Sequence, residues 1–123
     1  MFKTTIQLTD SQVAGLLCTA FEGDVGYWAQ VVGKRKPTGD CSVLDWKDYP
    51  LYSWPVSKGG VVKVKDIHTG KVYNLNRRSI EKGLKLMAEK NPCQFGKILN
   101  ENEDAITGDV FLQFCTLGDE LYG

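Results

Sequence analysis

The stretch that decides the fold is VVKVKDIHTGKVYNL, residues 61–75. Valine and lysine alternate over residues 62–65, which is the two-residue period of a strand with one buried face. A turn follows, in which Gly70 can take a positive φ, and residues 72–75 then return as a second strand. The stretch therefore predicts an antiparallel β-hairpin, with His68 exposed near its tip.

Four amphipathic helices are predicted around this hairpin. Thr9, with Gln12 three residues later, has the pattern of a capping box that opens a first helix, which Gly23 ends. Asn76 is expected to cap a second helix, and Pro92 suits the first position of a third. In chain order, the apolar stripes of the four helices contain Val13, Leu16, Leu17 and Ala20; Ile80, Leu84, Met87 and Ala88; Phe95, Ile98 and Leu99; and Ile106, Val110, Phe111, Phe114 and Leu117.

Residues 2–8, FKTTIQL, alternate apolar and polar side chains and predict one more short strand. The expected fold class is therefore α+β: a small antiparallel sheet, made of this N-terminal strand and the hairpin near 61–75, packed against about four helices. We expect a single globular domain over residues 1–123, with an irregular aromatic-rich loop at about 33–60.

The composition is that of a globular protein, with 42% hydrophobic and 24% charged residues. No stretch approaches the roughly 18 to 20 apolar residues of a membrane-spanning helix, and residues 1–10 lack the pattern of a signal peptide. We therefore expect no membrane partner and a location in the cytosol.

Charge is balanced overall but segregated along the chain. The 15 basic and 15 acidic residues cancel, which argues against a protein that coats nucleic acid in bulk. All the basic residues lie at or before Lys97, whereas residues 98–123 hold acidic residues and no basic one. This acidic tail either faces a partner or neutralises the basic part of its own fold, and we favour neutralisation.

The cysteines do not predict a metal site. Cys18, Cys41, Cys93 and Cys115 are widely spaced without a C-x-x-C pair, and His68 is the only histidine. We expect reduced thiols, no metal and no cofactor. A Cys/His nucleophile pair stays open, although nothing local supports one.

Aromatic residues with polar tips gather in and near the irregular region, where they suit base stacking or the anchoring of a protein partner. The alternative is that they cover the sheet. We favour that for any single ring, but expect at least one to face a cleft or a partner. Glu22 and Asp24 lie beside them at the end of the first helix, where the helix dipole does not stabilise a carboxylate. The candidate ligand- or partner-binding residues are Glu22, Asp24, Tyr27, Trp28, Trp46, Tyr49, Tyr52 and Trp54.

Two basic clusters are candidate anion contacts. The segment GKRKPTGD, residues 33–40, does not match the phosphate-binding loop pattern, so a solvated basic turn is the default interpretation. Arg77 and Arg78 fall in the first turn of a predicted helix, where positive charge is mildly unfavourable, and we favour their pairing with the acidic tail over an anion site. If the protein binds a nucleotide, the residues to test are Lys34, Arg35, Lys36, Arg77 and Arg78.

An enzyme is the minority hypothesis. General acid–base catalysis needs two carboxylates that converge in a cleft, and the spacing of the acidic residues shows no such convergence. The common hydrolase, zinc-protease and dinucleotide-binding motifs are absent from the sequence, and we assign no catalytic residue. The carboxylates that lie close together in sequence are Glu22/Asp24, Asp45/Asp48 and Glu101/Glu103/Asp104.

Two long stretches carry a family resemblance. They are LTDSQVAGLLCTAFEGDVGYW, residues 8–28, and GLKLMAEKNPCQFGKILNENEDAITGDVFLQFCTLGDELYG, residues 83–123. With the hairpin between them, they resemble a family of small uncharacterised proteins encoded by bacteriophages and prophages. The resemblance implies a phage gene expressed in the cytosol of a bacterial host, and it implies no particular activity.

The leading hypothesis is a non-enzymatic phage accessory protein that acts by binding. Such a protein would be a counter-defence factor that either blocks a host immune protein or sequesters a nucleotide signal. One alternative is a small carboxylate-dependent hydrolase or transferase, and another is a structural or assembly protein of the virion. The oligomeric state stays open, and a homo-oligomer is compatible with the sequence.

Overall fold

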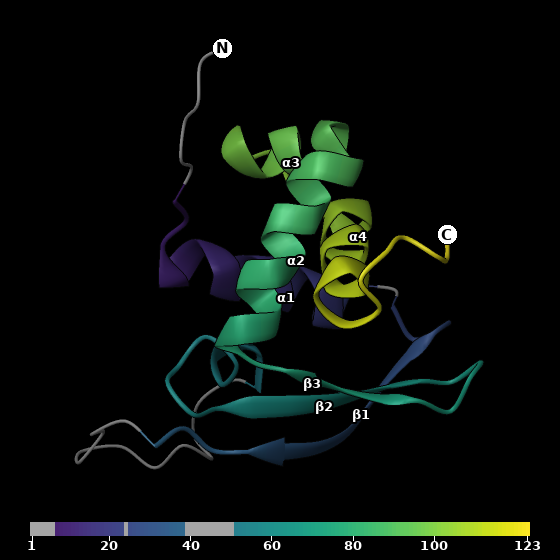
Figure 1. Cartoon of the computed structure of the whole chain (residues 1–123). Coiled ribbons are helices and arrows are strands. Elements are labelled where there is room, and N and C mark those ends of the chain that lie inside the picture. Colours follow the sequence, from purple (N-terminus) through teal and green to yellow (C-terminus); the bar gives the residue numbers. More distant parts are fainter. Residues whose placement is uncertain (1–6, 24, 39–50) are drawn as a thin grey trace.

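Four helices lie on one side of a three-stranded antiparallel sheet in the computed structural model of the chain (Figure 1). The structure describes residues 7–23, 25–38 and 51–123. The fold class is α+β, as the sequence predicts. The elements are α1 (Asp10–Glu22), β1 (Ala29–Arg35), the short 3₁₀ helix η2 (Leu51–Ser53), β2 (Val61–Asp66), β3 (Val72–Leu75), α2 (Arg77–Lys90), α3 (Pro92–Leu99) and α4 (Ala105–Thr116).

The predicted hairpin is confirmed. β2 and β3 pair in antiparallel fashion with Val64 opposite Tyr73, and Gly70 in the turn has a φ of 78°. The exposed residue Lys63 and the buried residues Val62 and Val64 alternate along β2, so one face of the sheet meets the helices and the other does not.

The third strand of the described sheet is one that the sequence did not predict. Residues 1–6 of the expected N-terminal strand are outside the described residues, and Gln7 and Leu8 belong to no strand. The strand that completes the sheet is β1, which pairs with β2 and gives the order β1-β2-β3. Its register shifts between Val31 and Gly33, and this irregularity breaks the alternation that would have revealed the strand.

The irregular segment is therefore shorter than expected, because residues 33–35 belong to β1. Residues 36–38 and 51–60 contain η2 and turns, while the remaining residues of the predicted loop, 39–50, lie outside the described part of the chain. The prediction had treated all of 33–60 as one loop.

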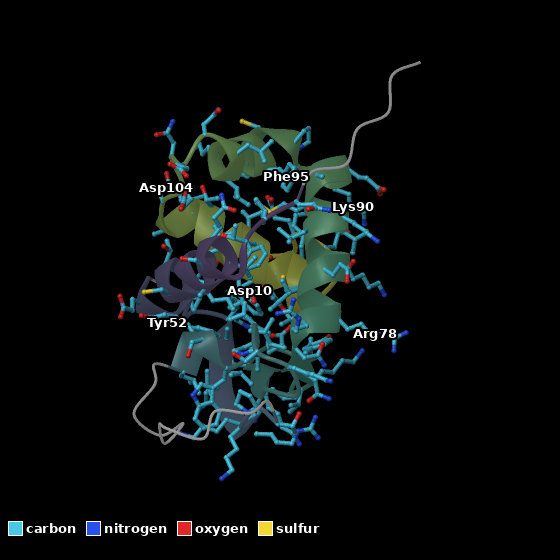
Figure 2. All side chains as sticks on the ribbon, turned by 90° about the vertical axis from the view of Figure 1, so that its left-hand side faces the viewer. Asp10, Tyr52, Arg78, Lys90, Phe95 and Asp104 are labelled. Atoms are coloured by element: carbon cyan, nitrogen blue, oxygen red, sulfur yellow. The ribbon has the colours of Figure 1, made fainter. Side chains whose placement is uncertain are left out.

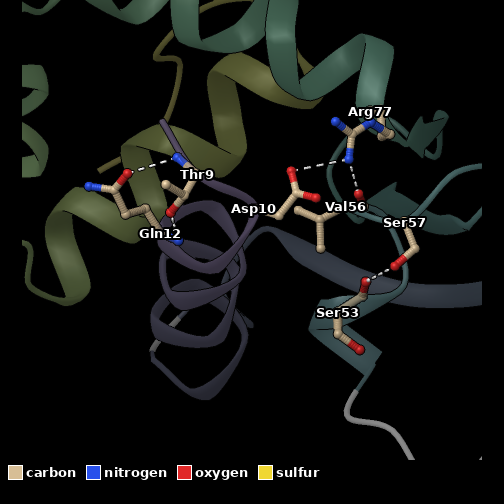
Figure 3. Close-up of polar contacts among 7 residues, drawn as sticks. All are labelled: Thr9, Asp10, Gln12, Ser53, Val56, Ser57 and Arg77. Atoms are coloured by element: carbon tan, nitrogen blue, oxygen red, sulfur yellow. Dashed lines mark hydrogen bonds and ion pairs between the residues drawn. The ribbon is translucent and has the colours of Figure 1, made fainter. Parts of the chain in front are cut away.

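Local capping signals fix where the helices begin. The hydroxyl of Thr9 accepts the backbone N–H of Gln12 at 3.1 Å, and the Gln12 side chain accepts the Thr9 N–H at 2.8 Å (Figure 3). Asn76 caps α2 through a second reciprocal pair with Ser79, and Pro92 begins α3. The helix starts predicted at these positions are confirmed.

α4 is the most deeply buried helix, and α1 and α2 both pack against it. Of its predicted stripe, Val110, Phe111 and Phe114 are buried, but Ile106 is 63% exposed, so its placement in the stripe is wrong. Burial extends around most of the helix, because it is covered from more than one side. The other buried residues of α4 are Thr107, Gly108, Leu112, Gln113 and Cys115.

Two glycines allow these helices to come close to α4. A Cβ atom on Gly83 of α2 would lie 2.7 Å from the Cα of Cys115. A Cβ atom on Gly108 would lie 2.8 Å from the backbone nitrogen of Ala20 in α1. Both distances are shorter than side chains allow, so the packing of α4 requires glycine at these two positions.

A methyl group added at either close approach should destabilise the fold. We expect Gly83→Ala and Gly108→Ala each to lower the free energy of unfolding by about 1 to 3 kcal/mol, measured by urea denaturation, because neither helix backbone can move away without disturbing the core. Gly96→Ala in α3 is the control: no atom lies within 4 Å of its Cβ position. It should stabilise the protein by up to about 1 kcal/mol. Equal effects of all three substitutions would contradict the packing argument.

Candidate functional site

A small basic pocket forms where β1 ends and α2 begins. It has a volume of about 280 Å³, and Figure 2 shows Arg78 beside the first turns of α2, at the opposite end of the helix from Lys90. Arg35 comes from β1 and pairs with Val61 at the start of β2. The residues that line this basic pocket are Arg35, Lys58, Gly59, Gly60, Val61, Asn76, Arg77 and Arg78.

The walls of the basic pocket are held by hydrogen bonds to the backbone. The N–H of Thr38 donates to the carbonyl of Lys58 at 2.9 Å, which joins the strand end to the turn before β2. Asn76 accepts the N–H of Ser79 at 2.9 Å and caps α2, so the positive end of this 14-residue helix borders the pocket. Four cationic residues and the N-terminus of α2 therefore line the same pocket.

The cations of the basic pocket have few acidic partners. Arg77 forms an ion pair with Asp10 at 3.2 Å, and its guanidinium also donates to the carbonyl of Val56 (Figure 3). Within residues 7–23, 25–38 and 51–123, no ion pair is formed by Arg35, Lys58 or Arg78. Counting the described residues alone, the pocket thus has an excess of positive charge.

The preferred pairing of Arg77 and Arg78 with the acidic tail is wrong. Arg77 pairs with Asp10 of α1, which precedes the tail. Two acidic residues of the tail pair instead with helical lysines, Asp119 with Lys90 at 3.6 Å and Asp104 with Lys97 at 3.5 Å. These two acids of the tail therefore pair with the helical layer and not with the basic pocket.

Three of the five predicted anion contacts line the basic pocket: Arg35, Arg77 and Arg78. Lys34 does not, because it lies opposite Val62 in the sheet and its ammonium sits 4.9 Å from the centre of the Trp54 ring. Lys36 follows β1 and is exposed, but it is not part of the pocket wall.

Lys58 is the cation that sequence reasoning missed. The only local signal was the Gly59-Gly60 pair beside it, and this signal means little without the strand that faces it.

An apolar groove lies next to the basic pocket, between the first turns of α1 and α2. Its volume is about 530 Å³, and Arg77 lines both cavities. Sequence reasoning did not find this groove, because its residues come from separate segments that only the fold brings together. The residues that line it are Gln7, Leu8, Asp10, Val13, Val56, Arg77, Ile80, Glu81, Leu84 and Lys85.

The predicted aromatic surface is mostly internal where the structure describes it. Trp28 is fully buried, and its indole N–H donates to the Oδ1 of Asp109 at 2.8 Å, so it is a core residue that a partner cannot contact. Trp54 is 6% exposed, and Tyr52 is half-buried beside α1. Tyr27 is 40% exposed, and its hydroxyl donates to the Oδ2 of Asp109 at 2.5 Å. Trp46 and Tyr49 lie outside the described residues.

Of the two acids singled out at the end of α1, Glu22 is exposed and Asp24 lies outside the described residues. Glu22 and Tyr52 meet at the Cys18 thiol. Burial, together with a hydrogen bond and the negative charge of Glu22, raises the pKa of Cys18, while the contact with Tyr52 acts in the opposite direction. A thiol that stays protonated at neutral pH is a poor nucleophile, so this cluster does not support the Cys/His pair.

The other carboxylate groups show no convergence within the described residues. Asp104 caps α4 by accepting the N–H of Thr107, and Asp45 and Asp48 lie outside the described residues. His68 contacts Tyr27 and Tyr122, and no described cysteine is among its hydrogen-bond or ring partners. In the described part of the chain, no group of three or more histidine, cysteine or acidic residues is arranged to hold a metal ion.

A second cluster explains why Trp28 is buried. Gln113 of α4 is fully buried, and its side-chain oxygen accepts the N–H groups of Leu121 and Tyr122 at 2.8 and 2.9 Å. Its amide nitrogen donates to Asp109 and to the Tyr122 carbonyl, both at 3.0 Å. We call this cluster the tail clamp, because Gln113 holds residues 121 and 122 against α4.

The tail clamp also reaches the hairpin. The Tyr122 ring stacks on Trp28 with 5.9 Å between ring centres, and its hydroxyl donates to the Oδ2 of buried Asp66 at 2.8 Å. The His68 side chain, exposed as expected, contacts the Tyr27 carbonyl through Nε2 at 3.0 Å. Trp28 and Tyr122, which lie near opposite ends of the sequence, therefore meet in this cluster.

Comparisons with known proteins add no relative: no family model matches the chain, and neither a curated protein nor a solved structure is significantly similar to it. None of the helices in the described residues combines the length and the apolar character needed to cross a membrane.

Asp66 of the tail clamp is held in its charged form. Burial acts to raise its pKa, but hydrogen bonds from the His68 N–H, the Tyr122 hydroxyl and Thr69 outweigh burial and lower the pKa below its usual value. The stabilisation of the fold by the charged Asp66 is therefore fully present above the unfolded-state pKa of about 3.9. It is lost as the pH falls through the lower folded-state pKa.

Replacing Asp66 should remove this acid sensitivity. We expect Asp66→Asn to lower the free energy of unfolding at pH 7 by about 1 to 3 kcal/mol, because the donors around it lose a charged acceptor. As the pH falls below about 4, the variant should lose stability less steeply than the wild type, measured by urea denaturation at each pH. Tyr122→Phe keeps the carboxylate and removes one donor, so its free energy of unfolding at pH 7 should lie between those of the wild type and Asp66→Asn. Parallel curves for wild type and Asp66→Asn would contradict this account.

Proposed function

We propose that this chain is a non-enzymatic, phage-encoded accessory protein that binds a phosphorylated ligand in its basic pocket and thereby sequesters it in the host cytosol. The observation that carries the proposal is that Arg35, Lys58, Arg77 and Arg78 all line one pocket at the N-terminus of α2. The phage origin rests on the resemblance of residues 8–28 and 83–123 to phage and prophage proteins.

Phosphate is the anion that this arrangement suits best. Arginine presents a planar fork of donors that matches phosphate oxygens, and lysine adds a point charge. The N-terminus of α2 adds backbone dipoles that favour negative charge. The volume of about 280 Å³ is smaller than that of most complete small-molecule sites, so the pocket would hold the phosphate part of a larger ligand.

Sequestration of a nucleotide signal is better supported than blocking of a host protein. Blocking through aromatic anchors needs exposed rings, yet in the described part of the chain Trp28 and Trp54 are buried and the Tyr27 hydroxyl is bonded to Asp109. The acidic tail is also partly engaged, through Lys90 and Lys97. A nucleotide signal fits a basic pocket without any exposed aromatic surface.

Substitution of the pocket cations tests the proposal directly. We expect purified protein to bind pyrophosphate or a member of a panel of linear and cyclic nucleotides in calorimetry, with affinity that falls as salt rises because charge dominates. Lys58→Ala and Arg78→Ala should each weaken binding by about tenfold or more, since each removes a charged hydrogen bond worth about 1.5 to 3 kcal/mol. Lys82→Ala is the matched control, because Lys82 is exposed on α2 outside the pocket.

Two results would overturn the proposed function. One is the absence of binding by every phosphorylated compound in the panel. The other is equal binding by wild type, Lys58→Ala and Arg78→Ala. As a cellular check, mass spectrometry of small molecules released from protein purified out of infected cells should find a phosphorylated compound with the wild type and not with the two pocket variants.

A further inference from the structure

We infer that the ligand of the basic pocket is a nucleoside phosphate whose nucleoside part lies in the apolar groove, on the other side of Arg77. This inference rests on the proposed function and deepens it. It assigns a second subsite, with its own chemistry, to a groove that the binding of phosphate alone would leave empty.

The two cavities are adjacent and share one wall residue. Arg77 lines both of them, and the segment from Val56 to Gly60 passes from the groove into the basic pocket. The first turns of α2 do the same, with Arg78 in the pocket and Ile80, Glu81 and Leu84 in the groove. A ligand with phosphates in the pocket would therefore direct its remaining atoms toward the groove.

The groove has the chemistry that a base requires. Its floor is apolar and firmly placed, since Val13, Val56 and Ile80 are core residues with 5% to 8% exposure. Its rim carries hydrogen-bonding side chains at Gln7, Glu81 and Lys85, of which Glu81 can accept N–H groups from the edge of a base. The volume of about 530 Å³ lies within the usual range for small-molecule sites.

Arg77 is positioned to serve both parts of such a ligand. Its guanidinium is fixed by Asp10 at 3.2 Å and by the Val56 carbonyl, as Figure 3 shows. A guanidinium can hydrogen-bond phosphate oxygens at its edge and stack a base on its face. Because Asp10 and Val56 already hold the side chain, little rotamer entropy is lost on binding.

A comparison of ligands separates this inference from the proposed function. We expect guanosine, adenosine or uridine diphosphate to bind the wild type about tenfold or more tightly than pyrophosphate in calorimetry, because burial of the nucleoside adds apolar contact. Leu84→Trp fills the groove and should abolish this advantage while pyrophosphate affinity stays unchanged. Leu99→Trp is the control, since Leu99 is 43% exposed on α3 and outside both cavities.

A rim variant keeps the test valid if Leu84→Trp does not fold. Glu81 is exposed, so Glu81→Gln should fold normally and change the ranking among the three nucleoside diphosphates without changing pyrophosphate affinity. The inference is overturned if pyrophosphate binds as tightly as the nucleoside diphosphates, or if a long-chain alkyl phosphate binds more tightly than any of them. In both cases the proposed binding of phosphate in the basic pocket would not be contradicted. Failure of pyrophosphate and all nucleotides to bind would instead overturn the proposed function itself.

Discussion

The close packing of α4 against two other helices is the constraint on which the rest of the structure depends. The backbone of α4 passes next to α1 at Gly108 and next to α2 at Gly83, and these contacts leave no room for a side chain. They set how far apart α1 and α2 lie, and hence where their first turns sit. Asp10 begins α1 and Arg77 begins α2. The packing of both helices against α4 therefore sets the distance between these two residues, and with it their ion pair and the groove beside it.

Features with a local cause were predictable from the sequence, and features that depend on distant partners were not. The capping residues Thr9 and Asn76 and the hairpin turn at Gly70 act through neighbours three or four residues away, so their patterns are readable. Trp28 looked like a surface anchor because its hydrogen-bond partner, Asp109, lies 81 positions away in sequence. β1 was missed because its bulge hides the period of the strand.

The same reasoning explains how much of the candidate site could be foreseen. Of the predicted anion contacts, Arg35, Arg77 and Arg78 line one pocket. Because side chains alternate along β1, Arg35 lines this pocket while Lys34 contacts Trp54 on the other face. Net charge was a poor guide as well. Positive and negative charges balance over the whole chain but not locally. Two acids of the tail pair with lysines of α2 and α3, whereas Arg35, Lys58 and Arg78 near the sheet form no ion pair within the described residues.

The tail clamp determines when the chain can complete its folding during synthesis. The ring that covers Trp28 belongs to Tyr122, which is synthesised 94 residues later. At translation rates of about 5 to 20 residues per second, the indole waits roughly 5 to 20 s on the ribosome for its neighbour. During that interval Asp66 also lacks the Tyr122 hydroxyl, and Gln113 has no backbone to bind. The nascent chain therefore exposes the last part of its core until synthesis has passed residue 122, and only then can cooperative folding close the structure.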